Sequence, residues 1–229
     1  MKLFQYIKDF FNLFFPDLCI VCNTHLVSQE DLICTKCLYN LPKTNYHKDL
    51  DNPVSRLFWG RTKVEYATAF FKFNKGSNYQ EMMHKFKYHG NKEIGCVLGM
   101  SFGNQLINSD FNKIDLIVPI PLHKSKLKKR GYNQSEWISI GLSETMQKPL
   151  DVKSVIRSIA TETQTRKGRY ERWKNVEEIF KVTNEKELRG KHILLVDDVI
   201  TTGSTMEACI NTILKVKDTK VSVAALAIA

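Results

Sequence analysis

Short apolar runs alternate along most of the chain with segments whose hydrophobic residues recur at helical spacing. The runs have the length and composition of buried strands, and they lie at residues 66–73, 114–120, 192–196 and 220–228. The amphipathic segments predict helices at residues 79–88, 93–107, 134–146 and 204–214. Strands that alternate with helices predict an α/β fold with a mainly parallel, doubly wound sheet. The ligand sites of such a sheet lie beyond the carboxyl ends of its strands.

The first sixteen residues form a separate apolar segment. Lys8, Asp9 and Asn12 interrupt it and no small-residue cleavage site follows, so it is not a secretory signal and we expect a cytoplasmic protein. The segment predicts an amphipathic helix, either packed on its own domain or offered to a partner or a membrane surface, with an apolar face made by Leu3, Ile7, Phe10 and Phe14. No apolar run of the sequence approaches the ~20 residues of a membrane span.

Four of the six cysteines form two pairs with the spacing of metal-binding knuckles, Cys19 with Cys22 and Cys34 with Cys37. Each Cys-x2-Cys turn can direct two thiolates at one ion, and four thiolates close a tetrahedral site with Zn–S bonds of about 2.3 Å. The alternative of two disulfides or free thiols is less favoured in a reducing cytosol. The spacing therefore predicts a structural Zn²⁺ site. A polar stretch follows, so we expect the helix, zinc module and linker within residues 1–60 and the α/β domain within residues 61–229.

Composition fits a globular protein, because 43% of the residues are hydrophobic and 25% are charged. The net charge of +10 is unevenly distributed: residues 120–175 carry thirteen basic and five acidic side chains, and residues 1–60 carry six of each. Such a cluster attracts polyanions, either nucleic acid or a small phosphorylated substrate. The positive charge alone does not distinguish nucleic acid from a small phosphorylated substrate as the ligand.

The most informative segment follows the apolar run at residues 192–196, where two carboxylates, Asp197 and Asp198, precede a loop of hydroxyl residues. A glycine in this loop lets the backbone approach a ligand, and amides at the start of the next helix point at an anion. The loop residues are Thr201, Thr202, Gly203, Ser204 and Thr205. Ser204 and Glu207 also have the spacing of a capping box. The carboxylates would repel a phosphate unless they hold sugar hydroxyls or a bridging Mg²⁺, so the segment predicts a phosphorylated-sugar site.

This segment resembles the phosphoribosyl pyrophosphate (PRPP) loop of type I phosphoribosyltransferases, a hydrophobic strand followed by two acidic residues and a Thr/Gly-rich turn. The resemblance implies that Asp197 and Asp198 engage the ribose hydroxyls and take part in catalysis. It also implies that residues 201–205 hold the 5′-phosphate, and that Mg²⁺ bridges the ribose and the pyrophosphate.

Two further stretches resemble the ComF family, competence-associated proteins that combine an N-terminal four-cysteine zinc module with such a domain. The first comprises residues 118–123 and residues 129–134, and the second contains Thr161, Gln164, Arg169, Arg172, Asn175 and Phe180. With the cysteines, the resemblance spans nearly the whole chain. It implies a PRPP or related phosphoribosyl ligand, and a link to DNA uptake with DNA-uptake proteins as partners.

Two basic segments would face this site. His123, Lys124 and Arg130 belong to a run after a predicted strand, where five cations in residues 124–130 suit a pyrophosphate, although such runs also occur as solvated turns. Asn133 has the spacing of a helix cap. Residues 164–175 are expected to close over the site as a loop, in which Arg169 would join catalysis and Gln164 and Arg172 would line the pyrophosphate.

The second basic segment also suits single-stranded DNA, because Tyr170 and Trp173 lie among its cations and bases stack on aromatic rings. Three functions therefore stay open: a PRPP-binding phosphoribosyltransferase, a non-catalytic single-stranded DNA-binding module of the DNA-uptake machinery, and a PRPP sensor. No residue pattern identifies an acceptor for the ribosyl group.

Overall fold

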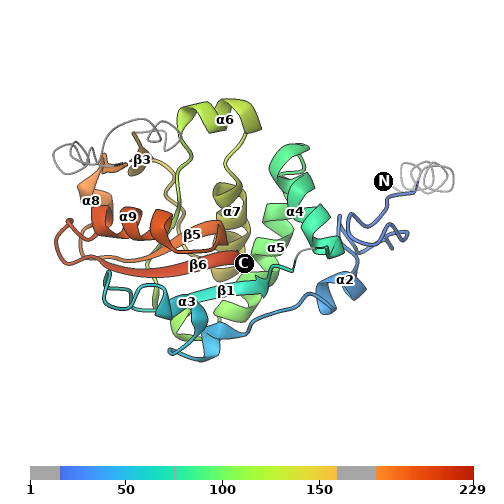
Figure 1. The fold of residues 1–229 in the computed structure, drawn as a ribbon, viewed down its shortest axis with the longest axis horizontal. Helices are drawn as coiled ribbons and strands as arrows, with labels where there is room; N and C mark the ends of the chain where they lie inside the picture. The colour runs from blue at the N-terminus through green and yellow to red at the C-terminus, as the bar shows by residue number, and fades with distance from the viewer. Residues whose placement is uncertain (1–15, 75, 159–178) are drawn as a thin grey trace.

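The computed structural model describes residues 16–74, 76–158 and 179–229, so the predicted helix in the first sixteen residues lies almost entirely outside the described part of the chain. The main sheet has four strands, all parallel, in the order β1-β6-β5-β2 (Figure 1). These strands are β1 (Ala67–Lys72), β2 (Leu116–Pro119), β5 (His192–Ile200) and β6 (Lys220–Ile228). The predicted α/β fold with a mainly parallel sheet is confirmed.

Strand β5 is longer than the sequence predicted. Its pairing with β6 continues past Val196, with Asp197 opposite Ala225 and Ile200 opposite Ile228. The prediction that the strand ends at Val196 was wrong, because hydrogen bonding to β6 extends the strand beyond its apolar run. The acidic pair is therefore held in a strand rather than in a loop.

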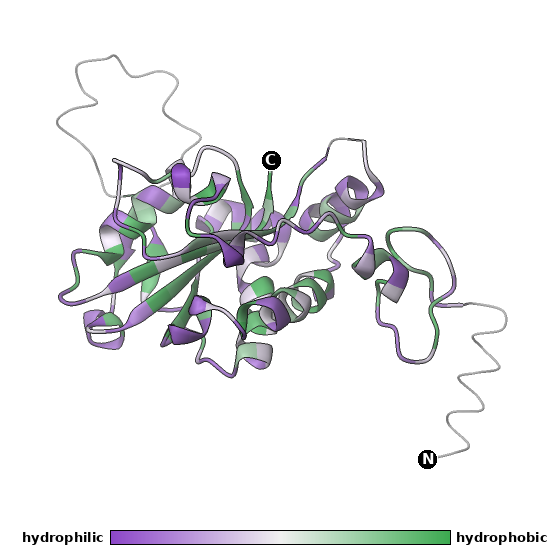
Figure 2. Cartoon of the chain, turned by 90° about the horizontal axis from the view of Figure 1, so that it is seen from below, coloured by the Kyte–Doolittle hydropathy of each residue, from purple (hydrophilic) through white to green (hydrophobic). Residues whose placement is uncertain are grey.

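Helices cover both faces of the main sheet, and the side chains of β5 alternate between the two cores. Leu194 and Val196 join one core, and Ile193 and Leu195 join the other. The first core is covered by α4 (Asn78–Tyr88), α5 (Glu93–Leu106) and α7 (Gln134–Met146), and the second by α3 (Pro53–Arg56), α8 (Glu185–Leu188) and α9 (Ser204–Ile213). Figure 2 shows hydrophobic colour along the strands between these layers.

Helices α5 and α7 are in backbone contact. A Cβ atom on Gly99 would lie 2.3 Å from the carbonyl oxygen of Ile138, and one on Gly141 would lie 2.1 Å from the carbonyl oxygen of Cys96. Only glycine fits at this crossing, which fixes α7 against α5. The amino end of α7, which carries Ser135, is thereby held next to β5.

Several short elements complete the fold. The strands β3 (Val155–Arg157) and β4 (Phe180–Val182) pair antiparallel on either side of residues 159–178, and the sequence did not predict them because three-residue strands leave little pattern. The remaining short helices are α2 (Thr35–Tyr39), η1 (Tyr46–Lys48), η2 (Asp110–Lys113) and α6 (Lys124–Arg130). No helix among the described residues is long and apolar enough to cross a membrane.

The cysteine-rich segment lies beyond α4 at the right of Figure 1 and shares a core with the sheet. Buried Cys37 and Leu41 belong to the same hydrophobic cluster as Phe70 of β1. The chain then runs along β1, where the amide of Thr44 donates to Phe70 O at 3.0 Å and the amide of Lys72 donates to Pro42 O at 2.9 Å. The domain boundary near residue 60 stays a prediction.

Candidate functional site

Asp197 lies near the carboxyl end of β5 and is half-buried. Its Oδ1 accepts hydrogen bonds from the Ser135 hydroxyl at 2.9 Å and from the Asp198 amide at 2.8 Å. Burial raises the pKa of Asp197 to about 7, and the neighbouring Asp198 carboxylate adds to this, while the two hydrogen bonds and Lys87 act in the opposite direction. This carboxyl group therefore changes charge near neutral pH.

Asp198 has a cationic partner that the sequence analysis missed. Lys87 Nζ, near the carboxyl end of α4, lies 3.0 Å from Asp198 Oδ2, and the two side chains are only 24% and 15% exposed. Asp198 Oδ1 accepts from the Val199 amide at 2.7 Å, so both carboxylate oxygens are engaged. Nothing in the local sequence around Lys87 signals this role, because its partner is brought to it only by the packing of α4 near the end of β5.

The predicted phosphate loop follows β5 and leads into α9. Gly203 has φ 74° and is the N-cap residue of α9, and a Cβ atom there would lie 3.3 Å from the Phe58 ring. The loop hydroxyls are exposed, and those of Thr202 and Ser204 lie 3.0 Å apart. Asp197, residues 199–205 and Met206 line a hollow of about 50 Å³. The structure thus brings Asp197 together with all five predicted loop residues at the start of a helix.

The capping-box prediction was wrong. Ser204 is the first helical residue of α9, its N-cap is Gly203, and no side chain caps this helix. The Glu207 carboxylate instead pairs with Arg61, whose guanidinium also donates to Thr202 O and to Leu57 O, each at 3.0 Å. Arg61, which the sequence analysis did not consider, therefore ties the loop to the segment that precedes β1.

The basic run at residues 124–130 forms the helix α6, not a turn. His123 is its N-cap, with Nδ1 accepting from the Ser125 amide at 3.2 Å, and Gly131 ends it in the left-handed conformation. Figure 1 shows α6 projecting beyond the amino end of α7. Lys124 is exposed, whereas Arg130 donates to Gln134 Oε1 at 2.8 Å and lies 5.5 Å from the centre of the Tyr88 ring. Arg130 thereby joins α6 to α4.

Other predicted residues divide into those with a structural role and those outside the described chain. Asn133 caps α7 as predicted: its side chain accepts from the Ser135 amide at 3.2 Å and donates to Ile120 O at 3.0 Å. Gln164, Arg169 and Arg172 lie outside the described residues, and their roles stay predictions.

Arg157 of β3 is a further charged residue near the acidic pair. Its guanidinium lies 5.3 Å from the centre of the Phe180 ring, and burial lowers the pKa of Arg157 while the charge of Asp197 acts in the opposite direction. In the sequence, Arg157 stands out only as one member of a basic stretch. Its position on β3 places a cation within the electric field of Asp197.

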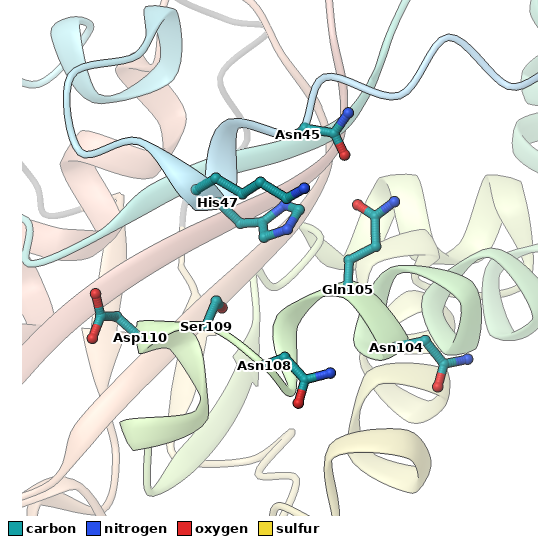
Figure 3. Close-up of a pocket in the computed structure, with 8 residues that line it drawn as sticks. Asn45, His47, Asn104, Gln105, Asn108, Ser109 and Asp110 are labelled. Carbon is teal, nitrogen blue, oxygen red and sulfur yellow. The ribbon is translucent and has the colours of Figure 1, made fainter.

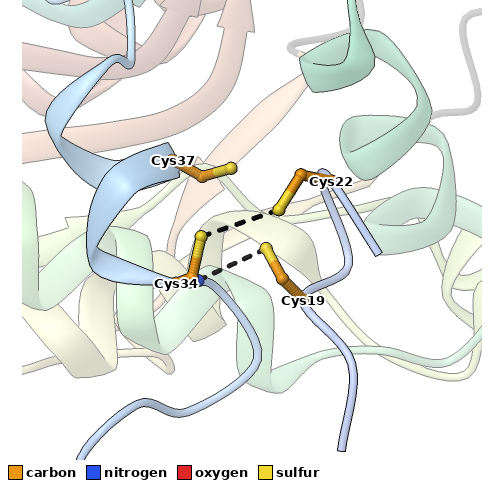
Figure 4. A group of neighbouring side chains, drawn as sticks. All are labelled: Cys19, Cys22, Cys34 and Cys37. Carbon is orange, nitrogen blue, oxygen red and sulfur yellow. Dashed lines mark hydrogen bonds between the residues drawn. The ribbon is translucent and has the colours of Figure 1, made fainter. Parts of the chain in front are cut away.

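The four cysteines converge on one point (Figure 4). Their sulfur atoms all lie within 4.8 Å of one another, and Cys22 Sγ is 3.7 Å from Cys34 Sγ. A tetrahedral site with Zn–S bonds of about 2.3 Å has S···S edges of about 3.8 Å. The Cys34 amide donates to Cys19 Sγ at 3.3 Å, as expected next to a thiolate. The donor set and its spacing fit a closed zinc site, and no cysteine among the described residues forms a disulfide.

The surroundings of the cysteines differ in polarity. Hydrogen bonds from the Thr24 hydroxyl and then from its backbone lower the pKa of the half-buried Cys22 thiol to about 6, whereas burial raises the pKa of the Cys37 thiol. The Tyr79 hydroxyl of α4 donates to Cys37 O at 2.9 Å. Helix α4 therefore contacts the cysteine cluster near its first turn and Asp198 near its last.

A polar hollow of about 660 Å³ lies away from both of these sites (Figure 3). Its lining comes from the segment before β1, the end of α5 and the start of η2, so it lies toward the amino ends of the strands. The lining residues are Asn45, His47, Lys48, Asn104, Gln105, Asn108, Ser109 and Asp110. None of them belongs to the predicted sites, although this hollow is larger than the one at the phosphate loop.

The chain is similar to a known domain family and to named bacterial proteins. Residues 99–228 match the family model described as the phosphoribosyl transferase domain. The chain is 28% identical to "DNA utilization protein YhgH" of Escherichia coli K12 over 82% of this chain and 80% of that protein. It is 28% identical to "Competence protein ComFC" of Bacillus subtilis over 83% of this chain and 76% of that protein.

Similarity to solved structures is weaker. The glutamine PRPP amidotransferase of Bacillus subtilis, solved with ADP and GMP, aligns with a TM-score of 0.44 and 16% identity over 62% of this chain and 30% of that chain. The family match instead covers more than half of the chain and includes β2, β5, the phosphate loop and β6. The chain therefore belongs to the phosphoribosyl transferase domain family, and its similarity to named competence and DNA-utilization proteins identifies it as a member of the ComF family.

Proposed function

We propose that this protein binds Mg²⁺-PRPP, or a related 5-phosphoribosyl ligand, at the carboxyl end of β5. One observation carries the proposal: two carboxylates near the carboxyl end of a buried parallel strand are followed, two residues later, by a hydroxyl-rich loop at the start of a ten-residue helix. A helix start with free amides favours a phosphate, and carboxylate oxygens favour sugar hydroxyls and Mg²⁺. A phosphorylated sugar satisfies both halves of the site.

Each part of the chain has a definite role in this proposal. The exposed hydroxyls and amides of residues 201–205 would hold the 5′-phosphate, with Gly203 allowing the close backbone approach. Asp197 and Asp198 would accept hydrogen bonds from the ribose, and their oxygens are suitable Mg²⁺ ligands. Because Lys87 engages Asp198 in the ligand-free chain, binding would require the lysine to give up this contact.

Turnover would need further groups on the pyrophosphate side. We assign the pyrophosphate to His123, Lys124 and Arg130 around α6, and to Gln164, Arg169 and Arg172 in the following basic segment. Cations placed where negative charge develops on a leaving group stabilise the transition state. Loss of pyrophosphate from the ribose would then make the protein a phosphoribosyltransferase, and the same site without turnover would make it a PRPP sensor.

Calorimetry with the full chain tests the binding site. PRPP should bind in the presence of Mg²⁺, and ribose 5-phosphate should bind more weakly because it lacks the pyrophosphate. Thr205→Val should weaken both ligands, since a phosphate donor is lost, whereas Thr219→Val, just before the amino end of β6, should leave them unchanged. Absence of PRPP binding to folded wild-type protein would overturn the proposal.

A second candidate, binding of single-stranded DNA, is favoured by the names of the relatives and by the exposed lysines of α6. The relevant cations are Lys124, Lys128 and Lys129. If they contact phosphates, replacing all three by Gln should weaken oligonucleotide binding and reduce its salt slope by roughly 0.7 per contact. Filter binding across a salt series would measure this, and an unchanged slope would exclude α6 as a DNA contact.

A further inference from the structure

A short segment that precedes β1 is fastened to the phosphate loop and to the first turn of α9. We call this segment, residues 57–62, the strap. Its Arg61 guanidinium donates to Thr202 O at 3.0 Å and pairs with the Glu207 carboxylate. Glu207 belongs to the first turn of α9, and its side chain is only 23% exposed. One strap residue therefore holds both a carbonyl of the loop and a carboxylate of the helix.

Further contacts fix the strap against the loop and the helix. The Thr62 hydroxyl donates to Asn211 Oδ1 at 2.7 Å, beyond the first turn of α9. Phe58 is buried, and its ring would meet a Cβ atom on Gly203 at 3.3 Å. The amides of Arg61 and Thr62 both donate to Phe58 O, at 3.0 and 3.1 Å. Arg61 is thus presented to the loop by a segment that is held on both sides of it.

The pairing of Glu207 matters because this residue would otherwise be able to close the start of α9. Ser204 and Glu207 have the capping-box spacing, in which the glutamate carboxylate accepts from the amide of the residue three positions earlier. The Ser204 amide is one of the donors that the proposed site offers to a phosphate. A carboxylate bound to it would occupy this donor and place a negative charge where the ligand brings another. In the structure, the Ser204 amide instead lies 3.5 Å from Thr202 Oγ1, the outer limit of a hydrogen bond.

Arg61 also sets the direction of the loop backbone. The carbonyl and the amide of one trans peptide point in opposite directions. Because Thr202 O is turned toward Arg61, the Gly203 amide faces away from the guanidinium. The residues that line the hollow at the loop include Gly203 and Ser204 but neither Arg61 nor Glu207. Arg61 therefore acts on the loop without lining the hollow.

We propose that Arg61 is a positioning residue that keeps the phosphate loop open by holding Glu207 away from the Ser204 amide. The inference rests on the proposed function, because an open helix start matters for binding only if an anion occupies it. The same segment then has two arrangements. Either Glu207 pairs with Arg61 and the Ser204 amide is available to a phosphate, or Glu207 accepts from Ser204 and the chain caps its own helix. Arg61 decides this competition in favour of the ligand.

The test compares the binding of ribose 5-phosphate and of inorganic phosphate to full-chain variants by calorimetry. Arg61→Met should weaken both probes about fivefold, the factor that a typical helix cap contributes to an equilibrium. Glu207→Ala should bind both probes at least as tightly as wild type. The double variant should return to within about twofold of wild type, because the competing carboxylate is gone. A double variant as weak as Arg61→Met would overturn the proposal.

Arg56→Met is the matched control for the loss of an arginine beside the loop. Arg56 directly precedes the strap and pairs with Asp51 at 2.6 Å, and both side chains are more than half exposed. This variant should bind ribose 5-phosphate as wild type does. An equal loss of affinity in the two arginine variants would show that total positive charge governs binding, and would overturn the proposal. If Arg61→Met does not fold, Glu207→Ala decides alone, and weaker binding than wild type would overturn the proposal.

A measurement without ligand separates this inference from the proposed function. Hydrogen exchange of the Ser204 amide, followed by NMR, should be slower in Arg61→Met than in wild type and fast again in the double variant, because only Arg61→Met lets Glu207 accept from this amide. Unchanged exchange in Arg61→Met would overturn the role of Arg61 even if ribose 5-phosphate binds. If wild-type protein binds neither ribose 5-phosphate nor PRPP while the exchange behaves as expected, the proposed phosphate site fails and the control of Glu207 by Arg61 stands.

Discussion

The cysteine cluster and the acidic pair are both concentrations of groups that become negatively charged, but the chain balances them differently. The sulfur atoms receive hydrogen bonds from a backbone amide and a hydroxyl, whereas Asp198 has a lysine of the same chain as its partner. Four thiolates at mutual distances within 4.8 Å would need a cation between them, and Zn²⁺ would provide it. Asp198 of the acidic pair already has a cationic partner, Lys87 of the same chain, and a bound cation would compete with it.

This difference is the one that we expect between a structural metal site and a ligand-binding site. A metal that closes four thiolates has no open position and is retained as long as the module is folded. A carboxylate with an internal counter-ion can exchange it for a sugar hydroxyl or an external cation without unfolding. We therefore expect changes at the cysteines to affect folding and changes at the acidic pair to affect ligand binding.

The largest effect is expected for removal of the metal. The double variant Cys34→Ser with Cys37→Ser should lose the one zinc ion per chain that we predict for the wild type, because two thiolates cannot close the site. Structural zinc contributes about 10 to 16 kcal/mol of binding free energy in zinc-finger peptides, so residues 16–42 should unfold first. Metal analysis together with hydrogen exchange of residues 16–42 measures both effects.

Cys96 provides the control for this experiment, because it lies in α5 outside the cluster. Cys96→Ser should retain a full complement of zinc. Wild-type protein prepared without chelators that contains almost no zinc, or a double variant that keeps it, would contradict the assignment.

The next largest effect concerns the acidic pair and is confined to the ligand. Asp197→Asn with Asp198→Asn should weaken Mg²⁺-PRPP binding at least tenfold, which corresponds to about 1.4 kcal/mol, a modest loss for charge-assisted hydrogen bonds. Zinc content should not change. Calorimetry on the folded double variant measures its affinity for Mg²⁺-PRPP. An unchanged affinity would contradict the proposed site.

The two regions also show what a sequence can reveal. The four cysteines lie within 19 residues of one another, and each pair reaches a common point through its own local turn, so spacing alone predicted the whole set. The loop at residues 201–205 could be recognised for the same reason, because its residues are contiguous, and its phosphate-binding role stays a prediction. By contrast, Lys87, Ser135 and Arg61 reach the acidic pair or the loop only through tertiary packing.

The fold shows the same limit. Apolar runs and helical periodicity predicted the four parallel strands and the helices α4, α5, α7 and α9, since each buries a continuous face. The end of β5 was misplaced because cross-strand hydrogen bonds, not apolar side chains, hold Asp197 and Asp198 in the strand. Helix α6 was read as a basic segment without periodicity, because none of its residues is buried.

A comparable effect, on stability rather than on the ligand, is expected for the internal counter-ion. Lys87→Met leaves Asp198 mostly buried without its cation and should lower the free energy of unfolding by about 1 to 3 kcal/mol. Adding Asp198→Asn should recover part of this loss, because the unpaired charge is then removed.

Lys85→Met is the matched control: Lys85 pairs with the exposed Glu81 on the same helix, and such surface pairs contribute about 0.3 to 0.5 kcal/mol. Equal losses in the two lysine variants, measured by urea denaturation, would show that the Asp198 contact has no special weight.

The last effect is a pH dependence of stability at Asp197, whose pKa burial raises to about 7. A carboxyl group with a folded-state pKa above its unfolded value contributes stability that is complete below the unfolded value of about 4 and is lost as the pH rises through the folded value. Asp197→Asn keeps the oxygen that accepts from Ser135 but carries no charge, so at pH 8 it should melt a few degrees above wild type. The difference in melting temperature should shrink as the pH falls through 7 and vanish near 4.

Differential scanning calorimetry from pH 4 to 8 measures this difference. Glu144→Gln, a change at an exposed carboxylate, is the control and should show no such trend. A variant that melts below wild type at pH 8 would show that the charged form of Asp197 stabilises the protein, so that Asp197, like the cysteines, would serve the fold rather than a ligand.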